Sequence, residues 1–272
     1  MKLSGKTLII TGAASGIGRA LAIEGARRGV STICTDRDGE GLDETKALVS
    51  EIADAGTCST HSLDVTDLAA WRDLRSSLQK EGDQIDGIIN NAGITFVGNA
   101  EETSYEQINQ VMAVNFMGQV YGSREFLADL KDRPEALIAN VSSILGLVPK
   151  ADQVAYCASK FAIRGYTEVL MQELKGTDVQ VSAIFPGHIG TDILANAIRA
   201  GSISRLDLTS DEQDVIANQF REHGLSPQKA AQIIMDGVEN GQSHILVGDD
   251  AIQADQSYRQ DPDNYGAVVE PA

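Results

Sequence analysis

The chain alternates between short runs of β-branched and apolar residues and longer stretches with helical periodicity, and this alternation restricts the folds open to it. Strands that alternate with helices form right-handed crossovers, which build a parallel sheet covered on both faces. The pattern therefore predicts an α/β fold with a doubly wound, Rossmann-like parallel sheet. The strand-like runs are Thr7–Ile10, Ser31–Thr35, His61–Leu63, Gly87–Asn90, Leu137–Val141 and Val179–Phe185.

One domain accounts for the whole chain. Its 272 residues are 42% hydrophobic and 22% charged, which is ordinary for a globular protein, and no proline- or serine-rich linker interrupts the pattern. We expect a single domain over residues 1–272, with a helical substrate lid at about 192–220 and a polar C-terminal tail at about 249–272. Small residues and flanking glycines indicate that the lid is mobile without ligand.

The net charge and the cysteine content restrict the binding partners and the cellular compartment that we expect. A net charge of −17 argues against nucleic acid and anionic membranes as partners. No apolar run reaches the roughly eighteen residues of a membrane span, and the N-terminus lacks the apolar core of a signal peptide. Cys34, Cys58 and Cys157 are odd in number and widely spaced, which favours a reduced cytoplasm. No Cys/His cluster has the spacing of a metal site, so we expect no metal.

A glycine-rich loop follows the first strand run and opens the first helix. Within Thr11–Gly18 the spacing is G-x-x-x-G-x-G, a variant of the dinucleotide-binding fingerprint. Glycines permit the tight turn and close backbone approach, while the helix N-terminus can receive a pyrophosphate. The second strand run ends at Asp36, eighteen positions past Gly18, where a carboxylate accepts hydrogen bonds from ribose hydroxyls. These features predict a dinucleotide site.

Tyr156 and Lys160 lie four residues apart on a predicted helix. A phenol with an unperturbed pKa near ~10 is a poor acid or base at neutral pH. A lysine one turn away lies on the same helix face, and we expect its charge to lower the pKa of Tyr156 toward the working range.

The ordered motifs resemble those of the short-chain dehydrogenase/reductase family, specifically its short single-domain branch. The resemblance runs from Lys6 to about Thr191, and more loosely to Val247. The extended epimerase branch, with a different glycine spacing and a longer substrate domain, takes second place. The matching segments are Thr11–Gly18, Asp64–Val65, Asn90–Gly93, Asn115, Ser142–Ser143, Tyr156 with Lys160, and Pro186–Thr191.

The resemblance implies a catalytic set of Asn115, Ser143, Tyr156 and Lys160. Ser143, thirteen positions before Tyr156, would hydrogen-bond the substrate carbonyl oxygen, whereas Ser142 would point into the structure. Tyr156 would transfer the hydroxyl proton, and Lys160 would bind the nicotinamide ribose and hold the tyrosine at a lowered pKa. Asn115 would distort its helix, with its carbonyl holding a water that leads to the lysine.

The same resemblance implies the cofactor contacts. Asp64 would touch the adenine amino group with Val65 beside the ring, the backbone of Asn91–Gly93 would approach the adenosine ribose, and Ile189 and Thr191 would anchor the carboxamide. The full set is Gly12, Ser15, Gly16, Ile17, Gly18, Asp36, Arg37, Asp64, Val65, Asn91, Ala92, Gly93, Tyr156, Lys160, Pro186, Gly187, Ile189 and Thr191.

Cofactor choice depends on charge near the ribose. Relatives that prefer NADP usually carry a basic residue before the second loop glycine, where this chain has Ser15. Asp36 would repel a 2′-phosphate, whereas Arg37 could meet one, stack over adenine or remain in solvent. Because the carboxylate is closest to the ribose, the predicted cofactor is NAD.

The predicted reaction is the interconversion of a secondary alcohol and a ketone on a mostly apolar small molecule, by tyrosine acid/base chemistry and hydride transfer. A catalytically idle NAD-binding regulator and an NADP-dependent 3-oxoacyl-type reductase are the alternatives. The C-terminal third lacks the closing segment of many tetrameric relatives, so we expect a homodimer through the helices at 107–130 and 155–174, with a homotetramer as the alternative. The apolar residues assigned to the dimer contact are Phe116, Tyr121 and Phe126, and those assigned to the pocket are Leu145, Leu147, Val148, Ile193, Leu194, Ile198, Ile203 and Leu206.

Overall fold

The computed structural model describes residues 1–53, 55–203 and 209–263. Its strands are β1 (Thr7–Thr11), β2 (Ser31–Asp36), β3 (Cys58–Ser62), β4 (Gly87–Asn90), β5 (Ala136–Val141), β6 (Val179–Pro186) and β7 (His244–Val247). They form one sheet in the order β3-β2-β1-β4-β5-β6-β7, and every neighbouring pair is parallel. The strand order reverses between β1 and β4, which is the position where such sheets bind ligands. The predicted doubly wound, Rossmann-like sheet is confirmed.

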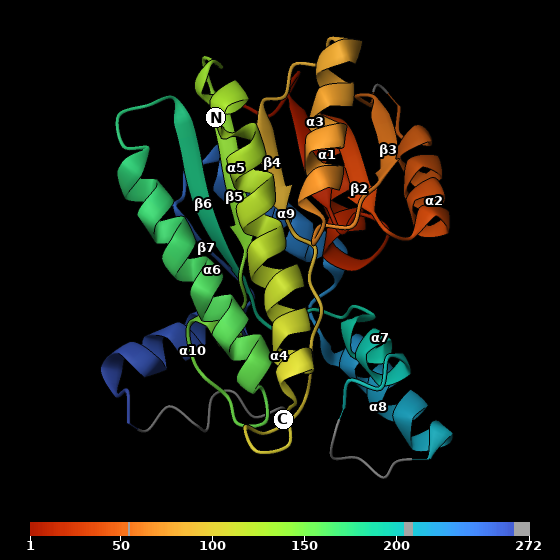
Figure 1. Cartoon of the computed structure of the whole chain (residues 1–272), viewed down its shortest axis with the longest axis vertical. Coiled ribbons are helices and arrows are strands. Elements are labelled where there is room, and N and C mark those ends of the chain that lie inside the picture. The colour runs from red at the N-terminus through yellow and green to blue at the C-terminus, as the bar shows by residue number, and fades with distance from the viewer. Residues whose placement is uncertain (54, 204–208, 264–272) are drawn as a thin grey trace.

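Helices cover both faces of the sheet (Figure 1). One apolar cluster joins α1, α2 and α9 to the sheet through Leu21, Val49 and Ile234, and a second joins α3, α5 and α6 through residues such as Trp71 and Leu170. Because successive strand residues point to opposite faces, a strand buried on both sides is apolar throughout. The helices are α1 (Gly16–Arg27), α2 (Gly39–Ser50), α3 (Leu68–Glu81), α4 (Tyr105–Met112), α5 (Gly118–Lys131), α6 (Val154–Glu173), α7 (Ile193–Arg199), α8 (Ser210–His223), α9 (Pro227–Glu239) and α10 (Asp249–Gln260).

The long helix predicted over Tyr105–Leu130 is interrupted by one wider turn. The π-helical segment η1 (Ala113–Met117) separates α4 from α5, and the Gly118 N–H donates to the carbonyl of Ala113, five residues back. Such π turns are rare and occur mostly at functional sites. The helix distortion expected around Asn115 is therefore present.

The expected polar tail is wrong over much of its length. Residues Asp249–Gln260 form α10, in which Ala251 and Ala254 are fully buried on one face, and Ala254 packs against Phe185 and Leu147. The signal was the i, i+3 spacing of two alanines, which is easily overlooked among charged neighbours. Residues 264–272 of the predicted tail lie outside the described residues.

Three apolar residues have other positions than those expected from the sequence. Phe126 is 1% exposed and packs edge-on against Trp71, so it belongs to the core and not to a subunit contact. Leu147 and Val148 are also core residues rather than pocket walls, because α10 covers that side. Leu206 lies outside the described residues. The homodimer stays a prediction.

Among the helices of the described ranges, none combines the length and the apolar character that a bilayer crossing requires.

Candidate active site

The four side chains implied to be catalytic lie beyond the carboxyl ends of β4 and β5. Ser143 ends the turn after β5 and begins the short 3₁₀ helix η2 (Ile144–Gly146). Tyr156 and Lys160 lie on the first two turns of α6, and Asn115 lies in η1. The carboxyl ends of parallel strands share one edge of the sheet, so elements far apart in sequence converge there.

Of the two adjacent serines, Ser143 is the one that contacts Tyr156. Its hydroxyl forms a hydrogen bond with Tyr156, and it also accepts one from the Leu145 N–H at 3.1 Å. The Ser142 hydroxyl instead donates to the Lys160 carbonyl at 2.7 Å and is buried. The expected orientation of the two serines is therefore present: Ser142 supports α6, and Ser143 faces the site.

Lys160 is held in a dry position beside Tyr156. Its side chain is 3% exposed, its Nζ donates to the Val141 carbonyl at 3.1 Å, and Nζ lies 5.4 Å from the centroid of the tyrosine ring. A Cβ added at Gly93 would lie 3.5 Å from this Nζ and 3.3 Å from Asn115 Oδ1. Gly93 therefore leaves room for the lysine and the asparagine to approach the same point.

Burial shifts the two pKa values in directions that the sequence argument did not anticipate. Burial raises the pKa of Tyr156 to about 12, with the hydrogen bond to Ser143 acting in the opposite direction. Burial also lowers the pKa of Lys160 to about 7. The expected lowering of the tyrosine pKa is wrong for the protein groups alone, because a poorly solvated lysine loses the charge that would stabilise a phenolate. At neutral pH the phenol keeps its proton.

Asn115 ties the loop after β4 to α6. Its side chain donates to the Ile94 carbonyl at 2.9 Å and to the Ser159 hydroxyl at 3.0 Å, and it accepts from the Ile94 N–H at 2.8 Å. Because Asn115 is fully buried, these bonds fix the positions of Ile94, which follows Gly93, and of Ser159, which precedes Lys160. A water held by its carbonyl stays a prediction.

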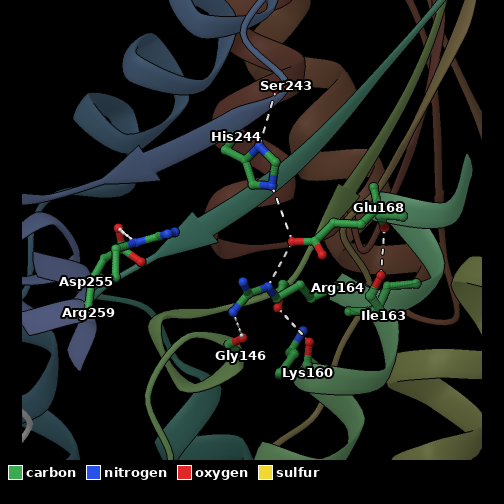
Figure 2. Close-up of polar contacts among 11 residues, drawn as sticks. Gly146, Lys160, Ile163, Arg164, Glu168, Ser243, His244, Asp255 and Arg259 are labelled. Atoms are coloured by element: carbon green, nitrogen blue, oxygen red, sulfur yellow. Dashed lines mark hydrogen bonds and ion pairs between the residues drawn. The ribbon is translucent and has the colours of Figure 1, made fainter. Parts of the chain in front are cut away.

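A polar network supports the serine turn one helical turn beyond Lys160 on α6. Figure 2 shows Arg164 between Glu168 and Gly146: its Nε donates to Glu168 at 2.9 Å, and its Nη1 reaches the Gly146 carbonyl at 3.4 Å. His244 Nε2, from β7, lies 3.3 Å from the same Glu168 oxygen. Although partial burial favours the neutral acid, Arg164 and His244 hold the pKa of Glu168 below its usual value. The C-terminal strand thus braces η2 through α6.

The glycine loop has the crowding of a phosphate cradle. Gly12 has φ +67°, and a Cβ there would lie 2.9 Å from the Ala92 Cα, while one at Gly18 would collide with the Gly12 carbonyl. Ser15 precedes α1, and its side chain makes no capping hydrogen bond in this described turn. The first-turn N–H groups are therefore directed at the loop surface, as a bound anion requires.

Asp36 is fixed at the carboxyl end of β2. Its carboxylate accepts from the N–H groups of Ala14 at 3.2 Å, Arg37 at 2.7 Å and Asp38 at 3.1 Å. The acceptance from Ala14 joins the end of β2 directly to the glycine loop. Arg37 is exposed and lies 3.8 Å from Asp64, so the two bracket the surface beside Asp36. This donor and acceptor set fits an adenosine ribose.

Asp64 and Val65 have local partners as well. Partial burial favours the neutral form of Asp64, but hydrogen bonds from the backbone and hydroxyl of Thr66 outweigh it and hold its pKa below the usual value. Val65 is buried in the core, and a Cβ at Gly118 would lie 2.8 Å from its side chain. Their adenine contacts stay predictions.

The loop after β6 approaches the glycine loop. A Cβ at Gly16 would lie 3.2 Å from the Thr191 methyl carbon, and Ile189 is 4% exposed beneath it. Between Asp36 at one end and Tyr156 at the other, these two loops provide backbone cradles of the kind that a dinucleotide requires. The residues present therefore fit NAD or NADP.

Sequence reasoning missed the side chains of Asp250 and His188, which hold the loop after β6 in place. The His188 N–H donates to Asp250 of α10 at 2.5 Å, and a Cβ at Gly187 would collide with the same carboxylate. The His188 ring lies 2.7 Å from the Phe220 carbonyl and packs on the ring of Phe220. The loop expected to anchor the carboxamide is thus fixed by α8 and α10. No local pattern links positions 188 and 250, because only the tertiary fold brings them together.

Comparison with known proteins identifies the family. The family model described as short chain dehydrogenase matches residues 6–200. The chain belongs to the short-chain dehydrogenase family. A Mycobacterium tuberculosis relative named as an oxidoreductase, SadH, is 33% identical over 269 residues, which cover 97% of this chain and 94% of the relative.

Two solved structures extend the comparison to cofactors. A short-chain dehydrogenase/reductase from Burkholderia phymatum, in complex with NAD, has a TM-score of 0.85 and 26% identity, covering 100% of this chain and 99% of its own. A serine dehydrogenase complexed with NADP⁺ has a TM-score of 0.76 and 25% identity, covering 89% and 94%. Of these two similar structures, one therefore holds NAD and the other NADP⁺.

Proposed function

We propose that this chain is an NAD-dependent oxidoreductase that interconverts a secondary alcohol and a ketone on a mostly apolar small molecule. The observation that carries the proposal is the hydrogen bond between Ser143 and Tyr156, with buried Lys160 5.4 Å from the tyrosine ring. A binding protein without catalysis would have no chemical need for a buried lysine that makes the site costly to fold. This favours the enzyme over an idle regulator.

Ser143, Tyr156 and Lys160 have distinct parts in the proposed reaction. When bound, the nicotinamide of NAD supplies the hydride acceptor or donor. The Ser143 hydroxyl hydrogen-bonds the substrate oxygen, and Tyr156 gives that oxygen a proton during ketone reduction. During alcohol oxidation Tyr156 takes the proton of the alcohol as its own proton passes to Lys160. The raised pKa of Tyr156, about 12, keeps the phenol protonated at neutral pH and favours its role as an acid. Lys160 binds the ribose hydroxyls, and because its pKa is about 7 it can take up a proton near neutral pH and return it to the tyrosine after reduction.

A panel of secondary alcohols and ketones tests the activity. Turnover is followed by NADH absorbance with each alcohol and NAD, and with each ketone and NADH. Tight NAD binding without turnover across a broad panel would support the regulator instead.

Asp36 is proposed to select NAD over NADP. Substitution of Asp36 by asparagine removes the charge and keeps an oxygen for the N–H groups of Arg37 and Asp38, which bond the same carboxylate oxygen, whereas the Ala14 N–H bonds the other oxygen. We expect the ratio of kcat/KM for NADP to kcat/KM for NAD to rise about tenfold or more, because repulsion against the 2′-phosphate is removed. The two values of kcat/KM are measured with one substrate.

Asp43→Asn is the matched control, since Asp43 lies exposed on α2 and carries the same charge. Its ratio should remain that of the unmodified protein. Equal kcat/KM for both cofactors in the unmodified protein would contradict the assignment of NAD.

The segment from Asp192 to Phe220 is proposed to close over the substrate. In its described part, Arg221 Nε donates to Asp192 at 3.0 Å, and the Val97 N–H donates to the Ser202 carbonyl at 2.9 Å. Few apolar contacts hold α7, of which only Ala197 is buried. We expect amide hydrogen exchange over this segment to slow about tenfold or more when NAD and a substrate analogue are both bound.

The amides of α9, which belong to the core, provide the internal reference for this measurement. Equal exchange of α7 and α8 with and without ligands would indicate a rigid wall and would remove the lid from the proposal.

The three cysteines of the chain are free thiols, which fits the reducing cytoplasm that we propose as its location.

A further inference from the structure

Two of the free thiols face each other at the edge of the sheet farthest from β7. Cys34 on β2 and Cys58 on β3 have their sulfur atoms 3.8 Å apart. The register pairs Thr32 with Cys58 and Cys34 with Thr60, so the two cysteines are diagonal neighbours on one face of the sheet. Cys34 is fully buried, whereas Cys58 is partly exposed. The pair is therefore accessible from one side only.

Cys58 lines a surface cleft. The cleft has a volume of about 310 Å³ and lies between α2 and the start of β3, with Lys46, Val49 and Ser50 along one wall. A partly exposed thiol beside a cation and a hydrogen-bond donor is the environment of reactive cysteines, whereas inert ones are enclosed by apolar groups. The cleft gives a small molecule access to one sulfur of the pair.

The surroundings assign different protonation states to the two thiols. Hydrogen bonding from Cys34, and secondarily the charge of Lys46, lower the pKa of Cys58 to about 6, although partial burial opposes them. The contact with Cys58, together with burial, raises the pKa of Cys34. Either sulfur can donate in the 3.8 Å contact, and the deeper burial of Cys34 favours the proton on that thiol.

We propose that Cys58 is a modification site that reacts with low-molecular-weight disulfides such as glutathione disulfide, with Cys34 as the buried partner that positions and stabilises the attacking sulfur. The Cys58 thiolate attacks one sulfur of the small disulfide, a new S–S bond forms, the original S–S bond breaks, and the released thiolate carries away the electron pair. Cys34 keeps its proton throughout. The product is one mixed disulfide in the cleft.

The adduct is coupled to the proposed NAD site through α2 and β2. Cys34 lies two residues before Asp36, and the Thr45 hydroxyl of α2 donates to the Ala13 carbonyl in the glycine loop at 2.8 Å. An adduct between β3 and α2 displaces the helix from this contact. We therefore expect the Kd for NAD to rise about threefold or more in the modified protein, a consequence that rests on the proposed function.

The test is intact-mass spectrometry of the folded protein after treatment with glutathione disulfide, followed by peptide mapping. We expect one adduct on Cys58, with a rate that rises through a midpoint near pH 6 rather than near the ordinary value of about 8.5. The midpoint is the decisive quantity, because a low pKa also weakens a thiolate as a nucleophile and so partly cancels the gain in rate.

Variants separate the roles. Cys58→Ser should acquire no adduct, and Cys34→Ala, which has no hydrogen-bond donor in its side chain, should shift the midpoint of Cys58 toward about 8.5. Cys157→Ser is the matched control, because burial raises the pKa of that thiol, and it should react as the unmodified protein does. A midpoint near 8.5 in the unmodified protein, or first labelling of Cys34 or Cys157, would overturn the site whether or not any variant folds.

The measurement of the Kd for NAD is independent of the mass measurement of the adduct on Cys58. An adduct on Cys58 with an unchanged Kd for NAD would overturn the coupling to the cofactor site. Failure of the unmodified protein to bind NAD at all would contradict the proposed function but leave the mass result on Cys58 interpretable.

Discussion

Replacement of Tyr156 by phenylalanine is expected to lower kcat/KM for alcohol oxidation and ketone reduction by about 10²- to 10⁴-fold while NAD binding persists. The hydroxyl is the group that hydrogen-bonds Ser143 and that would carry the proton, whereas the ring fills the space beside Lys160 in either residue. Steady-state kinetics with both directions of the reaction measure the loss, and isothermal titration measures the affinity for NAD.

Tyr166→Phe is the matched control for this substitution. Tyr166 lies on the same helix and packs edge-on against Phe116, ten residues beyond the proposed acid. Removing its hydroxyl should leave kcat/KM within about twofold. More than a tenth of the unmodified activity in Tyr156→Phe would show that the proposed acid/base mechanism is wrong.

Local spacing made much of this protein predictable. The glycine loop could be placed because its turn needs residues without a Cβ, as the crowding at Gly12 and Gly18 shows. The pairing of Tyr156 with Lys160 follows from one turn of helix. Ser143 required the resemblance to a family, since it lies thirteen positions before the tyrosine and an irregular turn comes between them. Its hydrogen bond with Tyr156 agrees with that register.

Properties that depend on tertiary burial could not be read from the sequence. The charge of Lys160 was expected to dominate the local electrostatics, but its burial beneath Gly93 makes desolvation the larger effect. Asp250 is 62 residues from the backbone N–H that it binds, and no pattern in α10 points toward that loop. Cys34 and Cys58 looked like two isolated thiols until the register of β2 and β3 brought them together. In each case the property depends on which residues the fold brings together in its interior.

Substitution of Lys160 by methionine is expected to lower kcat/KM by about 10²- to 10⁴-fold and at the same time to raise the thermal stability at pH 7. The lysine pKa falls from 10.5 to about 7 on folding, so burial of this group costs stability. Methionine has a similar length and no charge to desolvate. The Val141 carbonyl that Lys160 binds remains satisfied, because Gln119 Nε2 also donates to it at 3.0 Å.

The pH dependence of this stability difference identifies its cause. Between pH 7 and pH 10.5 the unfolded chain holds the Lys160 proton and the folded chain does not, so the unmodified protein gains stability from this group as pH rises. The advantage of Lys160→Met should therefore be largest at or below pH 7 and should vanish toward pH 10.5, as measured by denaturant unfolding at each pH.

Lys160→Arg should instead be less stable than the unmodified protein, because a guanidinium cannot give up its proton to escape the burial cost. If Lys160→Met proves less stable at pH 7, or if its difference from the unmodified protein is independent of pH, then the lysine is charged in the folded protein. Its proposed part as a poorly solvated group that gains and loses a proton near neutral pH would then be wrong.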